Sequence, residues 1–155
     1  MHAHYHTTSK HSRAIGPRKA LVRSLLESLI LFERIETTEA KAKTIKPAFD
    51  KLVTKAKKGG LANIRAIHAV LPTTAAEKLT QELVHGFADR PSGYTRLTKT
   101  GYRRGDAASM VMVELALDSD FEDKLKAIQA EKEKLATPAK ETKTATKKTK
   151  TGVAS

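Results

Sequence analysis

The chain has 155 residues, a formal net charge of +12 and no cysteine. Lys and Arg exceed Asp and Glu by 29 to 17, which indicates an acidic partner, nucleic acid first and a membrane surface second. The lack of cysteine excludes disulfides and thiolate metal sites, and no apolar run approaches the length of a bilayer span. We therefore expect one domain with a tail, and neither a membrane span nor a secretory signal.

Residues 1–15 are predicted to form a basic arm, because they contain no acidic residue and show no helical or strand period. We expect this arm to be extended or disordered when free. Its cations and its alternating histidines are Lys10, Arg13, His2, His4 and His6. Alternate imidazoles can bind a transition metal, but no nearby carboxylate orients these rings. We predict no metal site here and assign the two cations to phosphate binding.

A first helix is predicted to open at Gly16-Pro17, because proline is favoured at the first helical position. Apolar residues recur at four-residue intervals between Leu21 and Ile30 and form one stripe. The cations of the first turns are Arg18, Lys19 and Arg23. Positive charge at a helix start opposes the macrodipole, so either an external anion compensates it or these are plain surface residues. We favour phosphate binding at this helix start.

A short strand over residues 33–37 and a second helix capped by Thr38 come next. The apolar stripe of this helix begins at Ile45, and Gly59 is a suitable stop. Pro47 lies inside the stripe, so we expect a kink or a split there. The lysines of this helix are interpreted as a solvated face without a specific role: Lys41, Lys43, Lys46, Lys51 and Lys55.

Two more helices are expected, one over residues 61–71 and one that opens with a capping box at Thr74 and Glu77. Two strands follow, over residues 94–100 and 108–115. The second strand is almost continuously apolar, which favours a central strand covered on both faces. The predicted fold class is therefore α+β, with about four helices packed on a small three-stranded mixed sheet.

The composition changes near residue 118. We predict a globular domain over residues 16–117, an amphipathic helical extension over 118–135 and a disordered basic tail over 136–155. The extension is net negative, whereas the tail consists mostly of Lys, Thr and Ala. Tail lysines can lie loosely along RNA or can merely keep the tail solvated, and the sequence leaves both alternatives open.

The most informative stretch lies between Asp89 and Asp106, where cations alternate with glycine and tyrosine. Its cations, with no acid among them, are Arg90, Arg96, Lys99, Arg103 and Arg104. A solvated face is the usual outcome for a run of charge, but guanidinium groups on tight glycine turns suit phosphates and unpaired bases better. Tyr94 and Tyr102 can stack on bases or pack in a sheet, and both alternatives stay open. We predict a nucleic-acid contact here.

No constellation of catalytic residues accompanies these cations. The chain lacks a glycine-rich phosphate loop after a strand, an HExxH motif and a GxSxG motif. Ser24 and Ser28 lie on a helix without an obvious base, while Asp89 and Asp106 are expected to cap or pair with arginines. We predict that the protein is not an enzyme, and that it has no cofactor and no small-molecule substrate.

Several motifs occur in the order and spacing of one family: Arg18-Lys19-Ala20-Leu21, Glu33-Arg34-Ile35-Glu36-Thr37-Thr38, Ala56-Lys57-Lys58-Gly59, Ala88-Asp89-Arg90-Pro91 with Gly93-Tyr94-Thr95-Arg96, and Arg103-Arg104-Gly105-Asp106-Ala107-Ala108. Over residues 10–117 the chain resembles the bacterial large-subunit ribosomal protein seventeen family. The resemblance implies helices packed on a small mixed sheet. It implies a structural, non-catalytic role in binding large-subunit ribosomal RNA near the outer end of the polypeptide exit tunnel, beside other large-subunit proteins, in the cytoplasm.

The family carries its RNA contacts on the arm, the first helix and the arginine-rich loops. By resemblance these contacts are Arg13, Arg18, Lys19, Arg23, Arg90, Arg96, Arg103 and Arg104. The residues themselves add Lys10, Tyr94 and Lys99 to the predicted RNA-binding set. The alternative function is a free nucleic-acid-binding protein, such as a nucleoid or regulatory DNA binder, which composition alone allows.

Overall fold

The computed structural model describes residues 9–117, which belong to the first of two compact units of the chain. The predicted extension at 118–135 and tail at 136–155 lie outside the described residues. The elements in chain order are α1 (Ile15–Phe32), β1 (Arg34–Thr38), α2 (Glu39–Lys58), α3 (Leu61–His68), α4 (Thr73–Gln81), the 3-10 helix η1 (Leu83–Phe87), β2 (Thr95–Tyr102) and β3 (Ser109–Leu115). Four α-helices and three strands confirm the predicted α+β class.

The sheet has the order β1-β3-β2 and is antiparallel throughout. β1 pairs with β3 from Arg34 opposite Glu114 to Thr38 opposite Met110. The predicted mixed sheet is therefore wrong. β1 and β2 do run in the same direction, but β3 lies between them and runs opposite to both, so no parallel pair forms.

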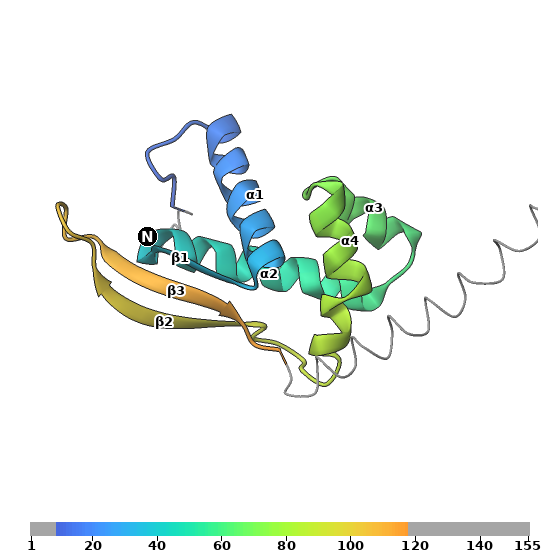
Figure 1. Cartoon of the computed structure of the whole chain (residues 1–155). Coiled ribbons are helices and arrows are strands. Elements are labelled where there is room, and N and C mark those ends of the chain that lie inside the picture. Colours follow the sequence, from blue (N-terminus) through green and yellow to red (C-terminus); the bar gives the residue numbers. More distant parts are fainter. Residues whose placement is uncertain (1–8, 118–155) are drawn as a thin grey trace, which may run out of the picture. The chain divides into compact units, whose positions relative to one another are not determined.

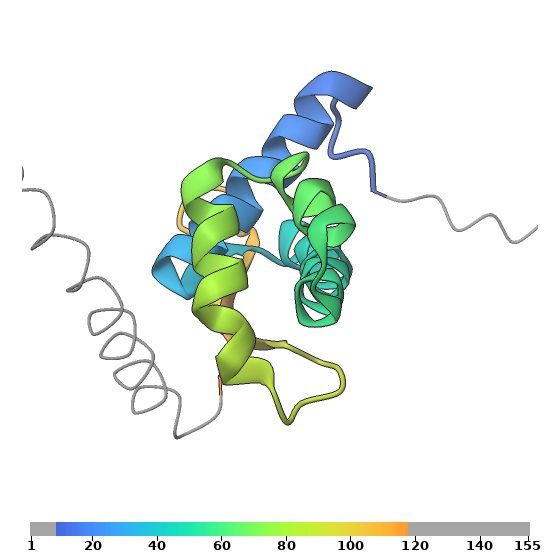
Figure 2. The ribbon, with the colours of Figure 1, turned by 90° about the vertical axis from the view of Figure 1, so that its right-hand side faces the viewer.

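The helices lie on one side of the sheet, and the β2–β3 hairpin extends beyond them (Figure 1). α4 packs against α1, α2 and α3, and it lies in front of α1 in Figure 2. The core between the helices and the sheet is aliphatic with two Phe rings. Its largest fully buried side chains are Phe49, Phe87, Leu26, Leu29, Ile30, Ile45, Ile67, Leu71, Leu79, Leu83, Val53 and Val113.

Pro47 does not split α2, which runs without interruption from Glu39 to Lys58. The proline is exposed, so its ring points away from the core. Buried side chains on both sides of it, such as Ile45 and Phe49, hold the helix to the rest of the domain. Tertiary packing thus outweighs the hydrogen bond that proline removes.

Several predicted helix signals act differently in the fold. Thr38 is the N-cap residue of α2, as predicted, but its side chain makes no capping hydrogen bond. α3 ends at His68, three residues before the predicted end. The capping box is wrong, because Pro72 is the N-cap residue of α4 and Thr74 and Glu77 therefore lie inside the helix.

β3 is the central strand, as predicted, but it is not covered equally on its two faces. Val111 and Val113 are buried on the side of the helices. Met110 and Met112 point to the opposite face and are only half-buried. Among the described residues no helix covers that face. The prediction that both faces of this strand are covered is therefore wrong.

Candidate nucleic-acid interface

The N-terminal arm is fastened to α2 by a contact between His11 and Thr44. Nε2 of His11 lies 3.0 Å from Oγ1 of Thr44, whose hydroxyl donates to the carbonyl of Ala40 at 3.1 Å. Because that hydroxyl hydrogen is already used, His11 is the donor to Thr44. The predicted cations Lys10 and Arg13 flank His11 and are exposed, and Nη1 of Arg13 donates to the His11 carbonyl at 2.9 Å. The histidine therefore sets where both cations are held.

The predicted cations of the first helix, Arg18, Lys19 and Arg23, line one open groove of about 700 Å³, here called the α1 groove. Its other lining residues are Ser9, Ala20, Val22, Leu26, Thr44, Ala69 and Val70. The first turn of α1 holds no acidic residue, and its N-cap Ala14 makes no side-chain capping bond. Within residues 9–117, the first turn of α1 therefore has no acid of its own to balance the positive charge at the helix start. The prediction of a bound phosphate depends on this lack of an internal counter-charge.

The tip of the β2–β3 hairpin carries Arg103 and Arg104, both exposed. Nε and Nη2 of Arg103 donate to the two carboxylate oxygens of Asp106 at 3.0 and 2.5 Å. This fork, together with the backbone N–H of Ala108, lowers the pKa of Asp106 to about 2, and it raises the pKa of Arg103. The expected pairing of Asp106 with an arginine is confirmed, and it stiffens the turn that presents Arg104 and the 79% exposed Tyr102.

The two predicted cations within β2 are held on opposite faces of the sheet. Arg96 lies opposite Glu114 on the face away from the helices, so an acid that is distant in sequence is its neighbour. Lys99 lies opposite Val111, on the helix side, just before an irregularity in the pairing. It is close enough to the first turn of α2 to contribute to lowering the pKa of Glu39. The cations between 90 and 104 therefore do not form one surface.

Lys57 of α2 fastens the loop between η1 and β2, in which Arg90 lies. Its Nζ donates to the carbonyl oxygens of Phe87, Ala88 and Arg90 at 3.0, 3.2 and 2.7 Å. The same ammonium lies 5.6 Å from the centroid of the Tyr94 ring. Arg90 itself is half-buried, and its loop enters β2 at the end away from the hairpin tip. Arg90 is thus separated from the other predicted contacts.

Tyr94 belongs to the core, which corrects its prediction as a base-stacking residue. It is 2% exposed, and its ring meets Phe87 edge to face at 5.2 Å. Its hydroxyl donates to the carbonyl of Pro91 at 2.9 Å. The sequence left open whether each tyrosine stacks on bases or packs in the sheet. Tyr94 packs in the core, whereas Tyr102 is exposed to solvent. Tyr102 was not in the predicted set, and only its distance from the core distinguishes it from Tyr94.

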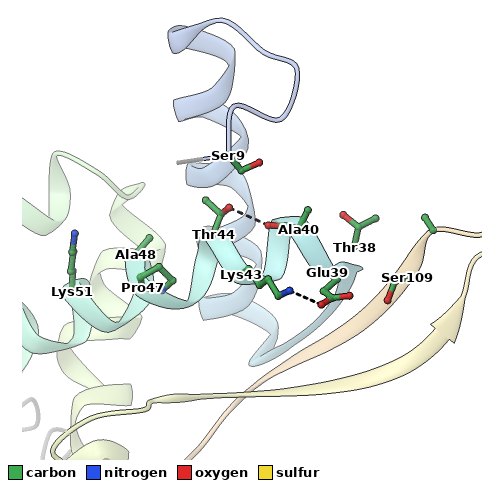
Figure 3. Close-up of a pocket in the computed structure, with 11 residues that line it drawn as sticks. Ser9, Thr38, Glu39, Ala40, Lys43, Thr44, Pro47, Ala48, Lys51 and Ser109 are labelled. Carbon is green, nitrogen blue, oxygen red and sulfur yellow. Dashed lines mark hydrogen bonds and ion pairs between the residues drawn. The ribbon is translucent and has the colours of Figure 1, made fainter. Parts of the chain in front are cut away.

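A second groove, here called the α2 groove, follows the outer side of α2 and encloses about 1160 Å³ (Figure 3). Its lining residues are Ser9, Thr38, Glu39, Ala40, Lys43, Thr44, Pro47, Ala48, Lys51, Ala108 and Ser109. Ser9 and Thr44 line both grooves, so the grooves meet at the arm. The arm, the start of α1 and the base of the hairpin tip are thereby brought together, although they are far apart in sequence.

Among residues 9–117, no three His, Asp or Glu side chains are placed to hold a metal ion. The histidines at positions 2, 4 and 6 lie outside the described residues. None of the helices between residues 9 and 117 is long and apolar enough to cross a membrane.

The fold and these surfaces define a small basic α+β protein whose cations lie on an arm, a helix start and a hairpin. The model of the ribosomal protein L17 family matches residues 21–116. The chain is 52% identical over 106 residues to the large ribosomal subunit protein bL17 of Gemmatimonas aurantiaca. The aligned region covers 68% of this chain and 90% of that protein. The corresponding protein of Erythrobacter litoralis is 45% identical, covering 74% and 82%, and that of Staphylococcus epidermidis is 43% identical, covering 68% and 96%.

The chain therefore belongs to the ribosomal protein L17 family. Members of this family are structural components of the ribosome and not enzymes, and a bacterial ribosomal protein works in the cytoplasm. The resemblance noted from the motifs is thus confirmed.

Proposed function

We propose that this chain is a structural constituent of the bacterial large ribosomal subunit that binds large-subunit ribosomal RNA near the outer end of the polypeptide exit tunnel, beside other large-subunit proteins. The names of its relatives carry the assignment to the large subunit. The position at the tunnel rests on the family resemblance alone. The RNA contact rests on the chain's own charge and on where its cations lie.

The observation that carries the RNA contact is the position of the cations in the fold. Lys10 and Arg13 lie on the fastened arm, and Arg18, Lys19 and Arg23 line the adjoining groove. Arg103 and Arg104 lie at the hairpin tip, with Arg96 and Lys99 further along the strand. Such contacts neutralise phosphates and fix the relative positions of the RNA segments they touch. We assign Arg90, at the opposite end of β2, to a separate contact.

Sedimentation tests the assignment to the large subunit. In a sucrose gradient of a native lysate, we expect the chain to migrate with large subunits at moderate salt and to stay with them at high salt. Loss at moderate salt, or migration with DNA, would favour the alternative of a free nucleic-acid-binding protein.

Filter binding to large-subunit ribosomal RNA tests the contact itself. If about six phosphates are neutralised in duplex-like RNA, the log–log salt dependence of the association constant has a slope of roughly −5. Arg104→Gln at the hairpin tip should make this slope less steep by about 0.9. Arg65→Gln is the matched control, because Arg65 is an exposed arginine of α3 outside the predicted set. A wild-type slope near zero would refute the RNA contact.

A further inference from the structure

The predicted RNA-binding set leaves the α2 groove unused. Six of its lining residues recur along α2 at intervals of three and one, which places them on one face of the helix. These residues are Ala40, Lys43, Thr44, Pro47, Ala48 and Lys51. They alternate with the buried stripe that contains Ile45 and Phe49, so this face is built separately from the core.

The floor of the α2 groove consists of small side chains, and lysines lie toward its two ends. Ala40, Pro47 and Ala48 present short side chains, which let the backbone of a ligand approach the helix closely. Lys43 and Lys51 are two turns apart, about 12 Å along the helix axis. In Figure 3 their side chains leave the helix on either side of Pro47. This spacing suits an extended polyanion better than a single small anion.

Glu39 is the acid among the described residues that line this groove, and its neighbours largely neutralise it. Oε1 of Glu39 lies 2.7 Å from Nζ of Lys43. Hydrogen bonds from Lys43 and then from Ser109 lower the pKa of Glu39, and Lys99 adds to this through its charge. An ammonium has three N–H donors, so Lys43 keeps donors for a phosphate while it holds Glu39. With Lys43 and Lys51 against one carboxylate among the described lining residues, this groove is net positive, and the nearby Lys99 adds to the positive charge.

Pro47 adds an acceptor to the groove floor. In a regular helix the N–H of residue 47 would donate to the carbonyl of Lys43, but proline has no N–H. That carbonyl therefore loses its helical donor beside the lysine side chains. Ribose differs from deoxyribose by a 2′-hydroxyl, which is a hydrogen-bond donor as well as an acceptor. Ser9 forms the far wall, because the His11–Thr44 contact holds the arm there.

We propose that the α2 groove binds a single ribose–phosphate strand of RNA, with Lys43 and Lys51 on phosphates and the Lys43 carbonyl accepting from a 2′-hydroxyl. This inference rests on the proposed function and extends it to a site where the sequence indicated only a solvated face. An acidic peptide fits less well, because the floor of Ala and Pro offers no deep pocket for a side-chain anchor. The groove also joins the α1 groove at Ser9, so one strand can follow both.

The test compares two double variants of the same helix by filter binding to large-subunit ribosomal RNA in a salt series. Lys43→Gln with Lys51→Gln removes both groove lysines. Lys46→Gln with Lys55→Gln removes the same charge from exposed positions that do not line the groove. Each phosphate of a single strand contributes about 0.7 to the salt slope, so the groove variant should lose about 1.4 and bind roughly 25-fold more weakly near 0.1 M salt. We expect less than half of this loss of slope in the control.

Equal losses in the two double variants would overturn the groove inference and leave the proposed function intact. A wild-type salt slope near zero would refute the proposed function itself. If the groove variant bound RNA as the wild type does, the groove would be free for an acidic peptide and the inference would again be wrong.

Pro47→Ala tests the carbonyl contact separately. Alanine restores the N–H that donates to the Lys43 carbonyl, so the helix should become more stable while RNA binding weakens about fivefold, the effect of one hydrogen bond. A matched DNA strand should bind this variant and the wild type equally. Unchanged or tighter RNA binding would overturn the 2′-hydroxyl contact. Because the Pro47→Ala variant is expected to be more stable than the wild type, weaker RNA binding by this variant cannot be explained by unfolding.

Discussion

Lys57→Met is the sharpest test of how the loop between η1 and β2 is held. Methionine keeps an unbranched apolar side chain of similar length but removes the ammonium. The carbonyls of Phe87, Ala88 and Arg90 then lose a shared donor, and the Tyr94 ring loses a cation 5.6 Å from its centroid. We therefore expect a loss of stability that begins in this loop.

The magnitude follows from the burial of the three bonds. Those to Phe87 and Arg90 are part-buried, whereas the bond to Ala88 is exposed and its carbonyl can regain water. A bond to a charged donor contributes roughly 1.5–3 kcal/mol, and a cation–π contact about 0.5–1 kcal/mol. Since water replaces part of each, we expect the free energy of unfolding to fall by about 2–3 kcal/mol. For a domain of this size the Tm should fall by roughly 8–15 °C.

Thermal and urea unfolding, followed by circular dichroism at helical wavelengths, measure this effect. Lys58→Met is the matched control, because Lys58 is the exposed neighbour on the same helix and carries the same charge. It should change stability by less than about 0.5 kcal/mol. Amide hydrogen exchange should rise in residues 88–94 of the Lys57 variant. If the two variants were equally stable, the loop would not depend on Lys57 and the reasoning would be refuted.

Three further outcomes are expected. The pKa of Asp106 is held at about 2 in the folded protein. Its contribution to the stability of the hairpin is therefore fully present above the ordinary carboxyl pKa and is lost as the pH falls toward 2. Carboxyl NMR should show a titration midpoint near pH 2, and a midpoint near pH 4 would refute the Arg103 fork. Tyr94→Phe should cost about 1 kcal/mol, because the hydroxyl loses its bond to Pro91, with RNA affinity unchanged. Tyr102→Ala should leave the Tm unchanged and weaken RNA binding; the reverse pattern would mean that the two tyrosines have been assigned the wrong roles.

The helices and strands could be predicted from local pattern. The four-residue repeat between Leu21 and Ile30 predicted one buried helix face, and the apolar run of β3 predicted a central strand; both elements lie where expected. Errors arose where a local signal competes with packing. Pro47 is a helix breaker by propensity, yet it sits on the exposed side of a well-buried helix. Thr74 and Glu77 have the spacing of a capping box, but the N-cap residue is Pro72, two residues before Thr74.

The candidate interface was predictable only as a list of cations. Their type and their setting among glycines indicate phosphate binding, and the family motifs gave all of these cations except Lys10 and Lys99. Their grouping was not predictable, because it depends on contacts between residues far apart in the chain. His11 and Thr44 are 33 positions apart, and nothing in the sequence pairs them. The same holds for Arg96 and Glu114, which meet only through the strand register.

The sequence by itself determined the charge of this protein, the types and order of its elements and its family, because these depend on composition, on periodicity and on short motifs. Tertiary structure alone decided which side chains face solvent. Tyr94 and Tyr102 stand in similar sequence surroundings, yet one ring fills the core beside Phe87 and the other lies beyond the end of the helices. It also made Lys43 and Lys51, two of the lysines of α2, part of the lining of a groove, because the arm and the hairpin reach that face only when the chain is folded.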